Sequence, residues 1–295
     1  MLNKSFAVIT SKKIRSFKKV IQVDSDKSIS IRSFLIGAIS HNISQIKNVL
    51  ESEDVYSTIK CLKKLGVKIR RIKKKEYLIY GKGLGSLYAK NNTELDFGNS
   101  GTLARLLIGI LSTTPDINLK INGDKSLVKR DMSKLIFLMN KFGAEFLPKN
   151  KFKLPLKIIS SEMPVGIYYK SGISAQLKSA VILAALNSFG TTRIYEDAKS
   201  RDHTENILIK NKKVFKVEKG NKNTLIINGK NYLNSLKLTI PGDPSSAAFI
   251  TALTLLNKNS SVRIKKVGLN PRRTGFYQLL KKSGAKISFK NIKKQ

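Results

Sequence analysis

One sequence pattern recurs four times along the chain and constrains its fold more than any other feature. Short polar turns, each containing a serine, lead directly into apolar runs with helical spacing. The four serines, Ser28, Ser100, Ser174 and Ser245, recur every 71 to 74 residues. A β-rich segment and a second amphipathic helix follow each apolar run. The pattern predicts a β/α unit of roughly seventy residues that is repeated along the chain.

Three of the repeats also end alike. The segments LKKLGVKI, MNKFGAEF and LKKSGAKI each place a glycine between an amphipathic helix and a strand. Glycine is favoured just after a helix because it adopts a left-handed backbone without steric cost. We therefore expect the second helices of these repeats to end at Gly66, Gly143 and Gly284. The third repeat lacks this ending, so the repeat is degenerate there.

The length of the repeat indicates the type of fold. A period of roughly seventy residues is longer than the common solenoid periods, so we expect compact duplicated units rather than an open array. A chain of 295 residues suggests about two domains. We therefore predict an α/β (α+β) fold built from repeated β/α units.

The chain is strongly basic, with 56 Lys and Arg residues, 19 Asp and Glu residues and a formal net charge of +37. Such a charge is typical of proteins that bind nucleic acids or acidic membranes. The lysines are spread over the whole chain, however, without the interleaved aromatic residues that stack on bases. We interpret the charge as a compositional bias. A basic nucleic-acid-binding protein remains the alternative, and a surface charge map would distinguish it.

Cysteine and histidine usage argues against two kinds of structural site. Cys61 is the only cysteine, so the chain has no internal disulfide, and its apolar helical surroundings place it in the core. With only His41 and His203 besides, a structural zinc site is not expected. We expect His203 to be a hydrogen-bonded structural residue.

The N-terminal stretch gives no targeting signal. Residues 1–22 form a basic, partly β-like lead-in, FAVIT followed by KKVIQV, without the apolar core of a signal peptide. No segment approaches the length needed to span a bilayer. We therefore expect a soluble, cytoplasmic protein.

Cations at helix starts break a local rule. Arg32 and Arg105 follow closely on the beginnings of two predicted helices, where the positive end of the helix dipole disfavours a cation. A bound anion would compensate, because a helix N-terminus with an added guanidinium is a ready anion site. An ordinary N-cap is the alternative interpretation. In the third repeat, Ser174 and Lys178 are spaced to lie on one helix face, with Gln176 able to reach the same place.

Seven ordered motifs together resemble one enzyme family: DKSISIRSFLIGAI, FGNSGTLARLLIGIL, GDKSLVKRDM, SGISAQLKSAVILAAL, SRDHTENIL, PGDPSSAAF and NPRRTGF. They are similar, in the same order and at compatible spacing, to the signature blocks of the 5-enolpyruvylshikimate-3-phosphate synthases, also called 3-phosphoshikimate 1-carboxyvinyltransferases. The SAQLKSA and SRDHTE forms resemble the bacterial class II branch of this family.

The resemblance implies a fold of two domains, each made of three copies of a β/α unit. It also implies a reaction in which the 5-hydroxyl of shikimate 3-phosphate attacks C2 of phosphoenolpyruvate, after which a tetrahedral intermediate loses phosphate. No cofactor or metal is required. The enzyme would act in the shikimate pathway of aromatic amino acid biosynthesis, as a monomer when full length. Its partners would be these two small-molecule substrates, with no nucleic acid and no membrane.

Two sets of site residues follow from the resemblance, motif by motif. The positions that match shikimate 3-phosphate contacts are Lys27, Ser28, Arg32, Ser174, Ala175, Gln176 and Arg201. The positions that match the phosphoenolpyruvate pocket are Lys27, Asn99, Gly101, Arg130 and Gln176. Arg130 would clamp the phosphate of phosphoenolpyruvate, and Lys27 is the candidate for proton transfer.

The chain departs from the family pattern at Asp131, in the third repeat, which is shortened after Leu208, and at its end. Asp131 stands where the family usually has proline, which leaves the placement of Arg130 open. Family members also carry an Asp general base, a Lys-Glu-x-x-Arg block, a His-Arg pair and a late Lys, none of which follows Arg273 in this sequence. We therefore expect a C-terminally truncated enzyme whose chain alone is inactive.

This expectation sets the domain boundaries. A complete domain of three units would cover residues 23–238, and residues 1–22 plus 239–295 would form part of a second domain. The apolar segment 250–256 would then lack its packing partners and form an exposed patch.

Two further alternatives are related to this reading. UDP-N-acetylglucosamine enolpyruvyltransferases share the fold and the chemistry, but their usual active-site cysteine lies on a different loop from Cys61, and they lack SRDHTE. An inactive protein that binds shikimate 3-phosphate without turnover is the second alternative. A turnover assay would separate it from an active enzyme.

Overall fold

The computed structural model describes residues 13–218 and 223–293, which form two compact units. Unit 1 consists of residues 1–24 and 242–295, and unit 2 consists of residues 25–241. The predicted lead-in segment FAVIT lies outside the described residues. Within the described ranges, no helix is both long enough and apolar enough to cross a membrane.

Unit 2 contains three four-stranded sheets of the same topology, with strand orders β13-β2-β4-β3, β5-β6-β8-β7 and β9-β10-β12-β11. In each sheet the first two strands pair in parallel and the remaining pairs are antiparallel. The predicted repeat of a β/α unit is therefore confirmed. The strands are β2 (Ile43–Lys47), β3 (Lys68–Lys73), β4 (Glu76–Tyr80), β5 (Glu94–Asp96), β6 (Asn118–Asn122), β7 (Glu145–Leu147), β8 (Leu156–Ile159), β9 (Tyr168–Ser171), β10 (Thr191–Glu196), β11 (Phe215–Glu218), β12 (Thr224–Asn228) and β13 (Lys237–Thr239).

The first sheet is completed from the far end of the unit. β13 takes the edge position beside β2 that β5 and β9 take in the other two sheets. Just beyond β13, the N–H of Ile240 donates to the carbonyl of Lys47 (2.9 Å), and the N–H of Asp26 donates to the carbonyl of Pro241 (2.9 Å). Ile240 is fully buried. Unit 2 therefore extends to Pro241, slightly beyond the boundary expected at 238.

Each repeat of unit 2 opens with a helix that begins at a side-chain cap. Asp26, Ser100 and Ser174 each accept the backbone N–H three residues further on, from Ile29, Leu103 and Leu177. A cap of this kind stabilises a helix by about 1 kcal/mol, because it satisfies a donor that the helix itself cannot. The capped helices are α1 (Lys27–Ile39), α3 (Gly101–Thr113) and α5 (Ala175–Ala185).

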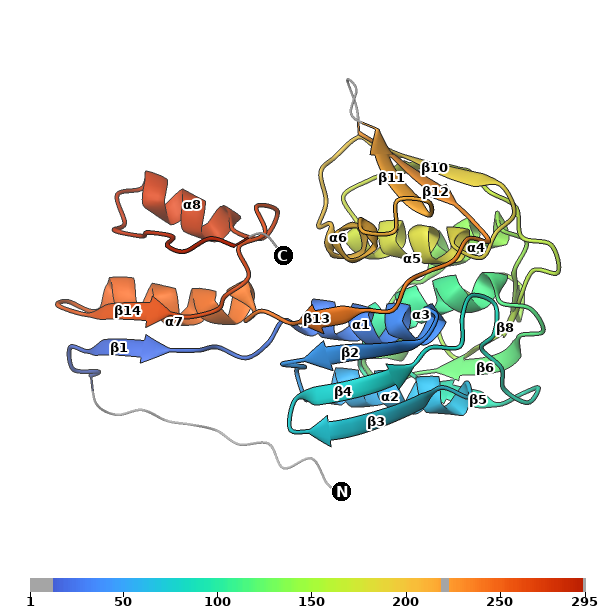
Figure 1. The fold of residues 1–295 in the computed structure, drawn as a ribbon, viewed down its shortest axis with the longest axis horizontal. Helices are drawn as coiled ribbons and strands as arrows, with labels where there is room; N and C mark the ends of the chain where they lie inside the picture. Colours follow the sequence, from blue (N-terminus) through green and yellow to red (C-terminus); the bar gives the residue numbers. More distant parts are fainter. Residues whose placement is uncertain (1–12, 219–222, 294–295) are drawn as a thin grey trace. The chain divides into compact units, whose positions relative to one another are not determined.

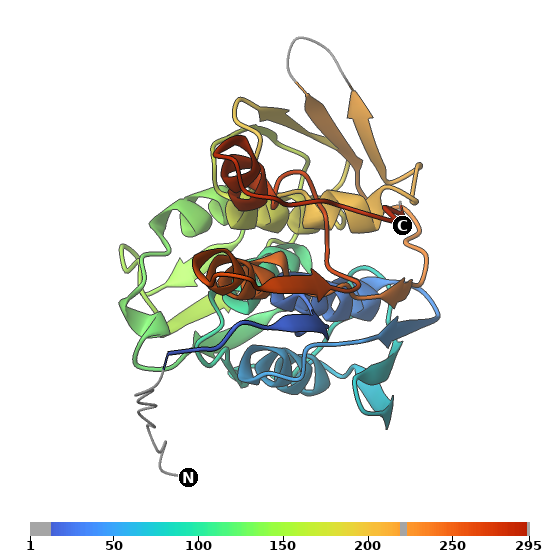
Figure 2. The ribbon, with the colours of Figure 1, turned by 90° about the vertical axis from the view of Figure 1, so that its left-hand side faces the viewer.

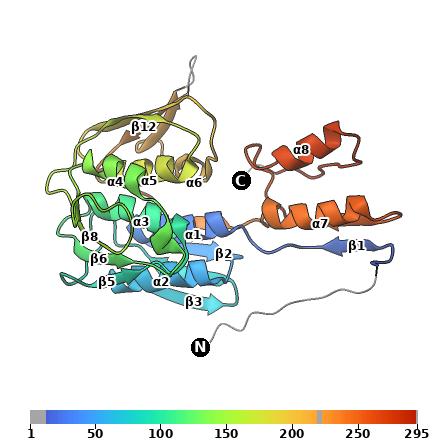
Figure 3. The same ribbon diagram turned by 180° about the vertical axis from the view of Figure 1, so that it is seen from behind.

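These three helices form the interior of unit 2 because they are apolar nearly all round. They lie between the sheet of β2, β3 and β4 and the sheet of β10, β11 and β12 (Figure 1). Figure 3 shows the same helices from behind, with α3 beside α5. A Cβ added at Gly109 of α3 would lie 2.5 Å from the carbonyl oxygen of Ala180. Gly109 therefore permits the close approach of α3 to α5.

The second helices end as the sequence predicts. Gly66, Gly143 and Gly284 follow α2 (Glu53–Lys64), α4 (Ser133–Asn140) and α8 (Gly275–Lys282), and all three have positive φ, at 80°, 92° and 90°. The third repeat, which lacks this glycine, has only the six-residue helix α6 (His203–Leu208). Cys61 on α2 is 1% exposed, as expected for a core residue.

Unit 1 holds a two-stranded parallel sheet and two helices. β1 (Lys18–Ile21) pairs with β14 (Ser261–Ile264), and α7 (Pro244–Leu256) packs beside β14 (Figure 2). Asp243 caps α7 by accepting the N–H of Ser245 (2.8 Å), and the Tyr277 hydroxyl of α8 donates to the carbonyl of Pro244. Helix α7 is thus the fourth helix of the predicted repeat.

Candidate functional site

The predicted residues on α1 converge on one guanidinium. Arg32 is 3% exposed, and its Nη1 donates to the Ser28 carbonyl (3.1 Å) and to the Ser28 hydroxyl (2.5 Å). The two side chains meet because positions i and i+4 lie on the same helix face. Arg32 is thereby held in a fixed direction at the beginning of α1.

Two hydroxyls that the sequence analysis did not single out complete the surroundings of Arg32. Its Nε donates to Thr204 Oγ1 on α6 (2.8 Å), and its Nη2 donates to Ser179 Oγ on α5 (3.1 Å). The Thr204 hydroxyl also donates to Ser179 Oγ (2.8 Å). Arg32 therefore links three helices through these hydroxyl and carbonyl oxygens. Thr204 lies in the SRDHTE motif, and this motif was the sequence feature that could have indicated a role for Thr204.

Lys27, the predicted proton-transfer residue, is the first residue of α1 and forms an ion pair. Its Nζ lies 2.9 Å from Asp54 Oδ2 on α2, and the Lys27 side chain is half exposed. The sequence analysis did not connect Asp54 with the site. The pair fixes the direction of a long side chain that would otherwise be mobile at the surface.

The third repeat places its predicted residues at the start of α5. Ser174 is the cap, Ala175 is the first helical residue, and Gln176 Nε2 donates to the Thr102 hydroxyl at the start of α3 (3.0 Å). This bond brings the N-termini of α3 and α5 together. Lys178, which follows Ser174 by one helical turn as the spacing predicts, is fully buried and pairs with Glu196 and Glu205.

Arg201 lies in the turn before α6 and is exposed. The next residue, Asp202, occupies the N-cap position of α6, and its carbonyl accepts the N–H of Asn206 (2.9 Å). Arg201 therefore lies three residues before Thr204, whose hydroxyl accepts a hydrogen bond from Arg32. The placement of Arg201 depends on how firmly α6 is held.

The second repeat brings its predicted residues together around Gly101. Arg130 Nη2 donates to Asn99 Oδ1 (2.5 Å). A Cβ at Gly101 would lie 2.8 Å from Arg130 Nη1 and 2.9 Å from Arg105 Nη1. A larger residue at this position would make the ends of both arginine side chains shift away from the first turn of α3.

Two cations therefore face one another at the N-terminus of α3. Arg105 Nη1 donates to the Gly101 carbonyl (3.2 Å), and burial together with the nearby Arg130 guanidinium lowers the pKa of Arg105. Two guanidiniums at the positive end of a helix dipole repel each other unless an anion lies between them. The geometry is suited to a phosphate or carboxylate group.

Asp131, the departure from the family pattern, has a structural role here. Its carboxylate accepts the N–H of Ser133 (3.0 Å) and the hydroxyl of Ser133 (2.7 Å) at the start of α4. These hydrogen bonds lower the pKa of Asp131. Arg130 follows the short 3₁₀ helix η1 (Leu127–Lys129) and still reaches Asn99, so the Asp at position 131 leaves that contact in place.

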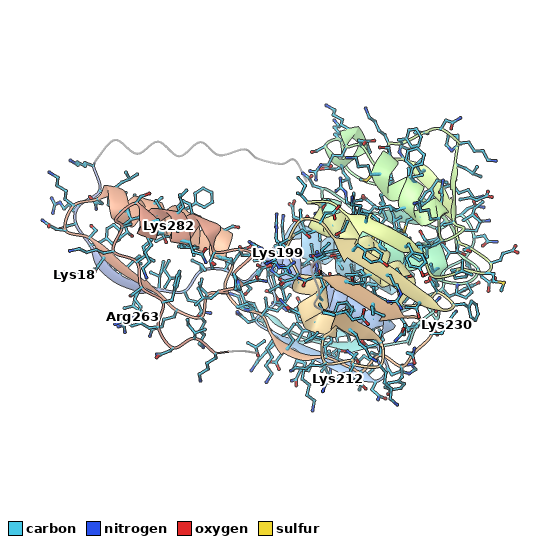
Figure 4. The ribbon with its side chains drawn as sticks, turned by 90° about the horizontal axis from the view of Figure 1, so that it is seen from above. Lys18, Lys199, Lys212, Lys230, Arg263 and Lys282 are labelled. Carbon is cyan, nitrogen blue, oxygen red and sulfur yellow. The ribbon has the colours of Figure 1, made fainter. Side chains whose placement is uncertain are left out.

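Three further lysines of unit 2 show how basic residues are spread over its surface. Lys199, Lys212 and Lys230 of unit 2 are exposed and lie at separate places around the unit (Figure 4). Such a distribution differs from the clustered basic face of a nucleic-acid-binding protein. Among the described residues, no group of three or more His, Cys, Asp or Glu side chains is placed to hold a metal ion.

Comparisons with known proteins identify the family to which this chain is similar. A family profile described as EPSP synthase (3-phosphoshikimate 1-carboxyvinyltransferase) matches residues 11–295. The 3-phosphoshikimate 1-carboxyvinyltransferase of Paramagnetospirillum magneticum is 38% identical over 276 residues, which are 92% of this chain and 61% of the relative. The enzyme of Bacillus subtilis is 39% identical over 280 residues, which are 94% of this chain and 64% of the relative.

A solved structure extends the similarity to the fold. EPSP synthase from Acinetobacter baumannii superposes with a TM-score of 0.83 at 34% identity, over 94% of this chain and 62% of that protein. The chain thus spans less than two thirds of the length of the relatives it matches. The predicted fold of repeated β/α units is confirmed. The chain belongs to the EPSP synthase (3-phosphoshikimate 1-carboxyvinyltransferase) family.

Proposed function

We propose that unit 2 binds shikimate 3-phosphate and that the whole protein transfers the enolpyruvyl group of phosphoenolpyruvate to its 5-hydroxyl, with release of phosphate. One observation carries the proposal. Three capped helix N-termini meet in unit 2, and Arg32, Arg105 and Arg130 lie beside them. Both substrates are phosphorylated, and such an arrangement binds anions.

Shikimate 3-phosphate is held between α1, α5 and α6 in this proposal. Arg32 and Ser28 provide donors from α1, while Ser174, Ala175 and Gln176 provide a hydroxyl, a backbone N–H and an amide from the start of α5. Arg201 approaches from the turn before α6. These groups surround a planar carboxylate and a phosphate with charge-assisted hydrogen bonds, each typically worth about 1.5–3 kcal/mol.

Phosphoenolpyruvate is held at the start of α3. The guanidinium of Arg130, fixed by Asn99, contacts its phosphate, and the missing side chain of Gly101 leaves space for it. Lys27 and Gln176 complete the pocket. We assign Arg105 to the same anion site, because burial and the nearby Arg130 guanidinium disfavour its positive charge, Asp131 favours it, and a bound anion would favour it further.

In the reaction, the 5-hydroxyl of shikimate 3-phosphate gives up its proton to a base and its oxygen forms a bond to C2 of phosphoenolpyruvate, while the double bond takes up a proton at C3. The tetrahedral intermediate then loses phosphate from C2 and a proton from C3, which restores the double bond. Lys27 takes part in proton transfer, with Asp54 holding its ammonium in place (2.9 Å). The helix N-termini stabilise the negative charge of the departing phosphate.

A polypeptide of these 295 residues tests the proposal directly. Isothermal titration calorimetry should detect weak binding of shikimate 3-phosphate, and the Arg32→Ala variant should abolish the heat. A phosphate-release assay with both substrates should give no turnover, since the family's Asp general base and late basic residues match nothing here. General acid–base groups contribute about 10² to 10⁴ each in rate. Turnover by this polypeptide would contradict the assignment of the missing groups, and absence of binding would contradict the proposed site.

Two properties of the whole protein accompany this proposal. A reaction between small soluble metabolites without a membrane partner fits a cytoplasmic location. The pocket residues assigned above all belong to one chain, which fits a monomer. Cell fractionation and sedimentation of the whole protein would test both properties.

A further inference from the structure

A buried charge cluster lies directly behind the hydroxyl pair that holds Arg32. Lys178 of α5 is fully buried, and its Nζ lies 2.6 Å from Glu196 Oε1 at the end of β10 and 2.5 Å from Glu205 Oε1 on α6. Glu196 and Glu205 are 6% and 5% exposed. One ammonium thus serves two carboxylates in the interior of unit 2, and the reaction described above uses none of the three.

The cluster and the hydroxyl pair are neighbours along both helices. Ser179 follows Lys178 on α5, and Thr204 precedes Glu205 on α6. Helices α5 and α6 are therefore joined twice, by the ion pair between Lys178 and Glu205 and by the hydrogen bond from Thr204 to Ser179 (2.8 Å). Both hydroxyls of that bond accept N–H groups of Arg32.

Helix α6 needs such an anchor. It has only six residues, whereas isolated helices shorter than about 12 residues are marginal in water. Its repeat also lacks the glycine ending that closes the second helices elsewhere. Leu208 gives α6 an apolar contact with the core, and Glu205 adds an ionic contact with Lys178.

A buried pair of this kind is costly as a source of stability alone. Removing charges from water costs several kcal/mol per ion, and apolar residues of similar volume often stabilise a core equally well. Burial raises the pKa of Glu205 although the Lys178 ammonium opposes this effect. A role in fixing the position of α6 would explain why unit 2 keeps this buried ion pair despite its desolvation cost.

We propose that the ion pair of Lys178 and Glu205 is a positioning device for the substrate site, which holds α6 so that Thr204 orients Arg32 and the preceding turn presents Arg201. The inference rests on the proposed binding of shikimate 3-phosphate. Lys178 and Glu205 act through α6 and do not touch substrate, and Glu196 is the second carboxylate beside the Lys178 ammonium.

The two carboxylates provide a matched comparison. Glu205→Gln removes the ionic link between α5 and α6, but it leaves Lys178 paired with Glu196, so no unpaired charge remains buried. Glu196→Gln removes the same charge from the same cluster and keeps the link to α6. Glu51→Gln, which alters a carboxylate bound to Arg71 and Tyr77 away from α6, serves as the control for loss of stability.

The first measurement needs no ligand. Hydrogen–deuterium exchange of the 295-residue polypeptide should show faster exchange in α6 for Glu205→Gln than for Glu196→Gln or Glu51→Gln. Equal protection of α6 in all three variants would overturn the inference, whether or not the protein binds shikimate 3-phosphate.

The second measurement is the dissociation constant of shikimate 3-phosphate by calorimetry. Glu205→Gln should weaken binding roughly tenfold, because displaced site groups lose much of their contribution. Glu51→Gln should leave the constant unchanged, and Glu196→Gln should have a smaller effect than Glu205→Gln. Equal losses in Glu196→Gln and Glu205→Gln would overturn the positioning role. A wild-type protein that does not bind would contradict the proposed function, while the exchange result would still stand.

Discussion

Helices α3 and α7 open their repeats in the same way and yet have opposite environments. Both have 13 residues, both begin at a side-chain cap, and both are predominantly apolar. Helix α3 buries 11 of its residues, whereas α7 buries only Pro244, Ala247 and Thr251. Phe249 and Leu256 of α7 are 79% and 87% exposed.

The difference shows what the repeat pattern does and does not determine. Local sequence fixes the cap and the helix in both cases, because these depend on groups a few residues apart. Burial of a helix depends on sheets that belong to other repeats. Unit 2 supplies these sheets because it contains three repeats, each with a four-stranded sheet of the same topology. The exposed leucines in the segment 250–256 of α7, expected from the sequence, form an apolar surface without such a cover in the described residues.

The largest expected effect is on the free energy of unfolding when one leucine is truncated in each of the two helices. Leu107→Ala in α3 should lower the free energy of unfolding by about 2–5 kcal/mol, because it leaves a cavity in a packed core. Leu256→Ala in α7 should change it by less than about 0.5 kcal/mol. Urea titration followed by circular dichroism measures both. Similar losses for the two variants would show that α7 is packed as well as α3.

The second prediction concerns the arginines at the helix starts of unit 2. Arg32→Ala should weaken shikimate 3-phosphate binding, and Arg130→Ala should weaken phosphoenolpyruvate use, each by about 1.5–3 kcal/mol. Each change removes one charge-assisted contact from a different ligand. Calorimetry with the separate ligands measures the effect, and Arg71→Ala, whose guanidinium pairs with Glu51, is the control. Equal effects of Arg32→Ala and Arg130→Ala on both ligands would contradict the division of roles.

Most of the fold and some contacts within the candidate site could be predicted from sequence for the same physical reason. Caps, glycine endings and the contact of Arg32 with Ser28 depend on residues a few positions apart. The contacts of Arg32 with Ser179 and Thr204, and of Lys27 with Asp54, join residues from different helices. Such pairings depend on packing and not on spacing along the chain.

The same reason explains why the partners of Lys178 were not predicted. Its spacing from Ser174 indicates a shared helix face, but its two acidic partners come from β10 and α6. The edge strand β13 was also beyond prediction from the repeat alone, because it joins β2 across the whole of unit 2.

A smaller effect compares the glycine endings of the two units. Gly143 in unit 2 and Gly284 in unit 1 both have φ near 90°, so alanine is strained at either position by about 1 kcal/mol. At Gly143 a Cβ would also lie 2.4 Å from the Ser161 hydroxyl oxygen, whereas at Gly284 nothing lies within 4 Å. Thermal unfolding should therefore show a larger loss for Gly143→Ala. Equal losses would mean that backbone strain alone governs both positions.

The smallest expected effect is a pH dependence of the free energy of unfolding that arises from Cys61 in the core of unit 2. Burial raises the pKa of Cys61 to about 12, and its thiol donates to the carbonyl of Asp96 (3.2 Å). Because the folded pKa lies above the unfolded value, this stabilisation is complete below the unfolded pKa of about 8.5 and is lost as the pH rises toward the folded value. Between pH 8 and pH 9.5 the wild type should lose about 1 kcal/mol more than Cys61→Ala, measured by urea titration of both proteins. In the same range, a thiol reagent should label Cys61 only as fast as unit 2 opens. If the free energy of unfolding of the two proteins depended on pH in the same way, or if the folded protein were labelled rapidly, the prediction would be wrong. The core around α2 would then be as open to solvent as the surface of α7.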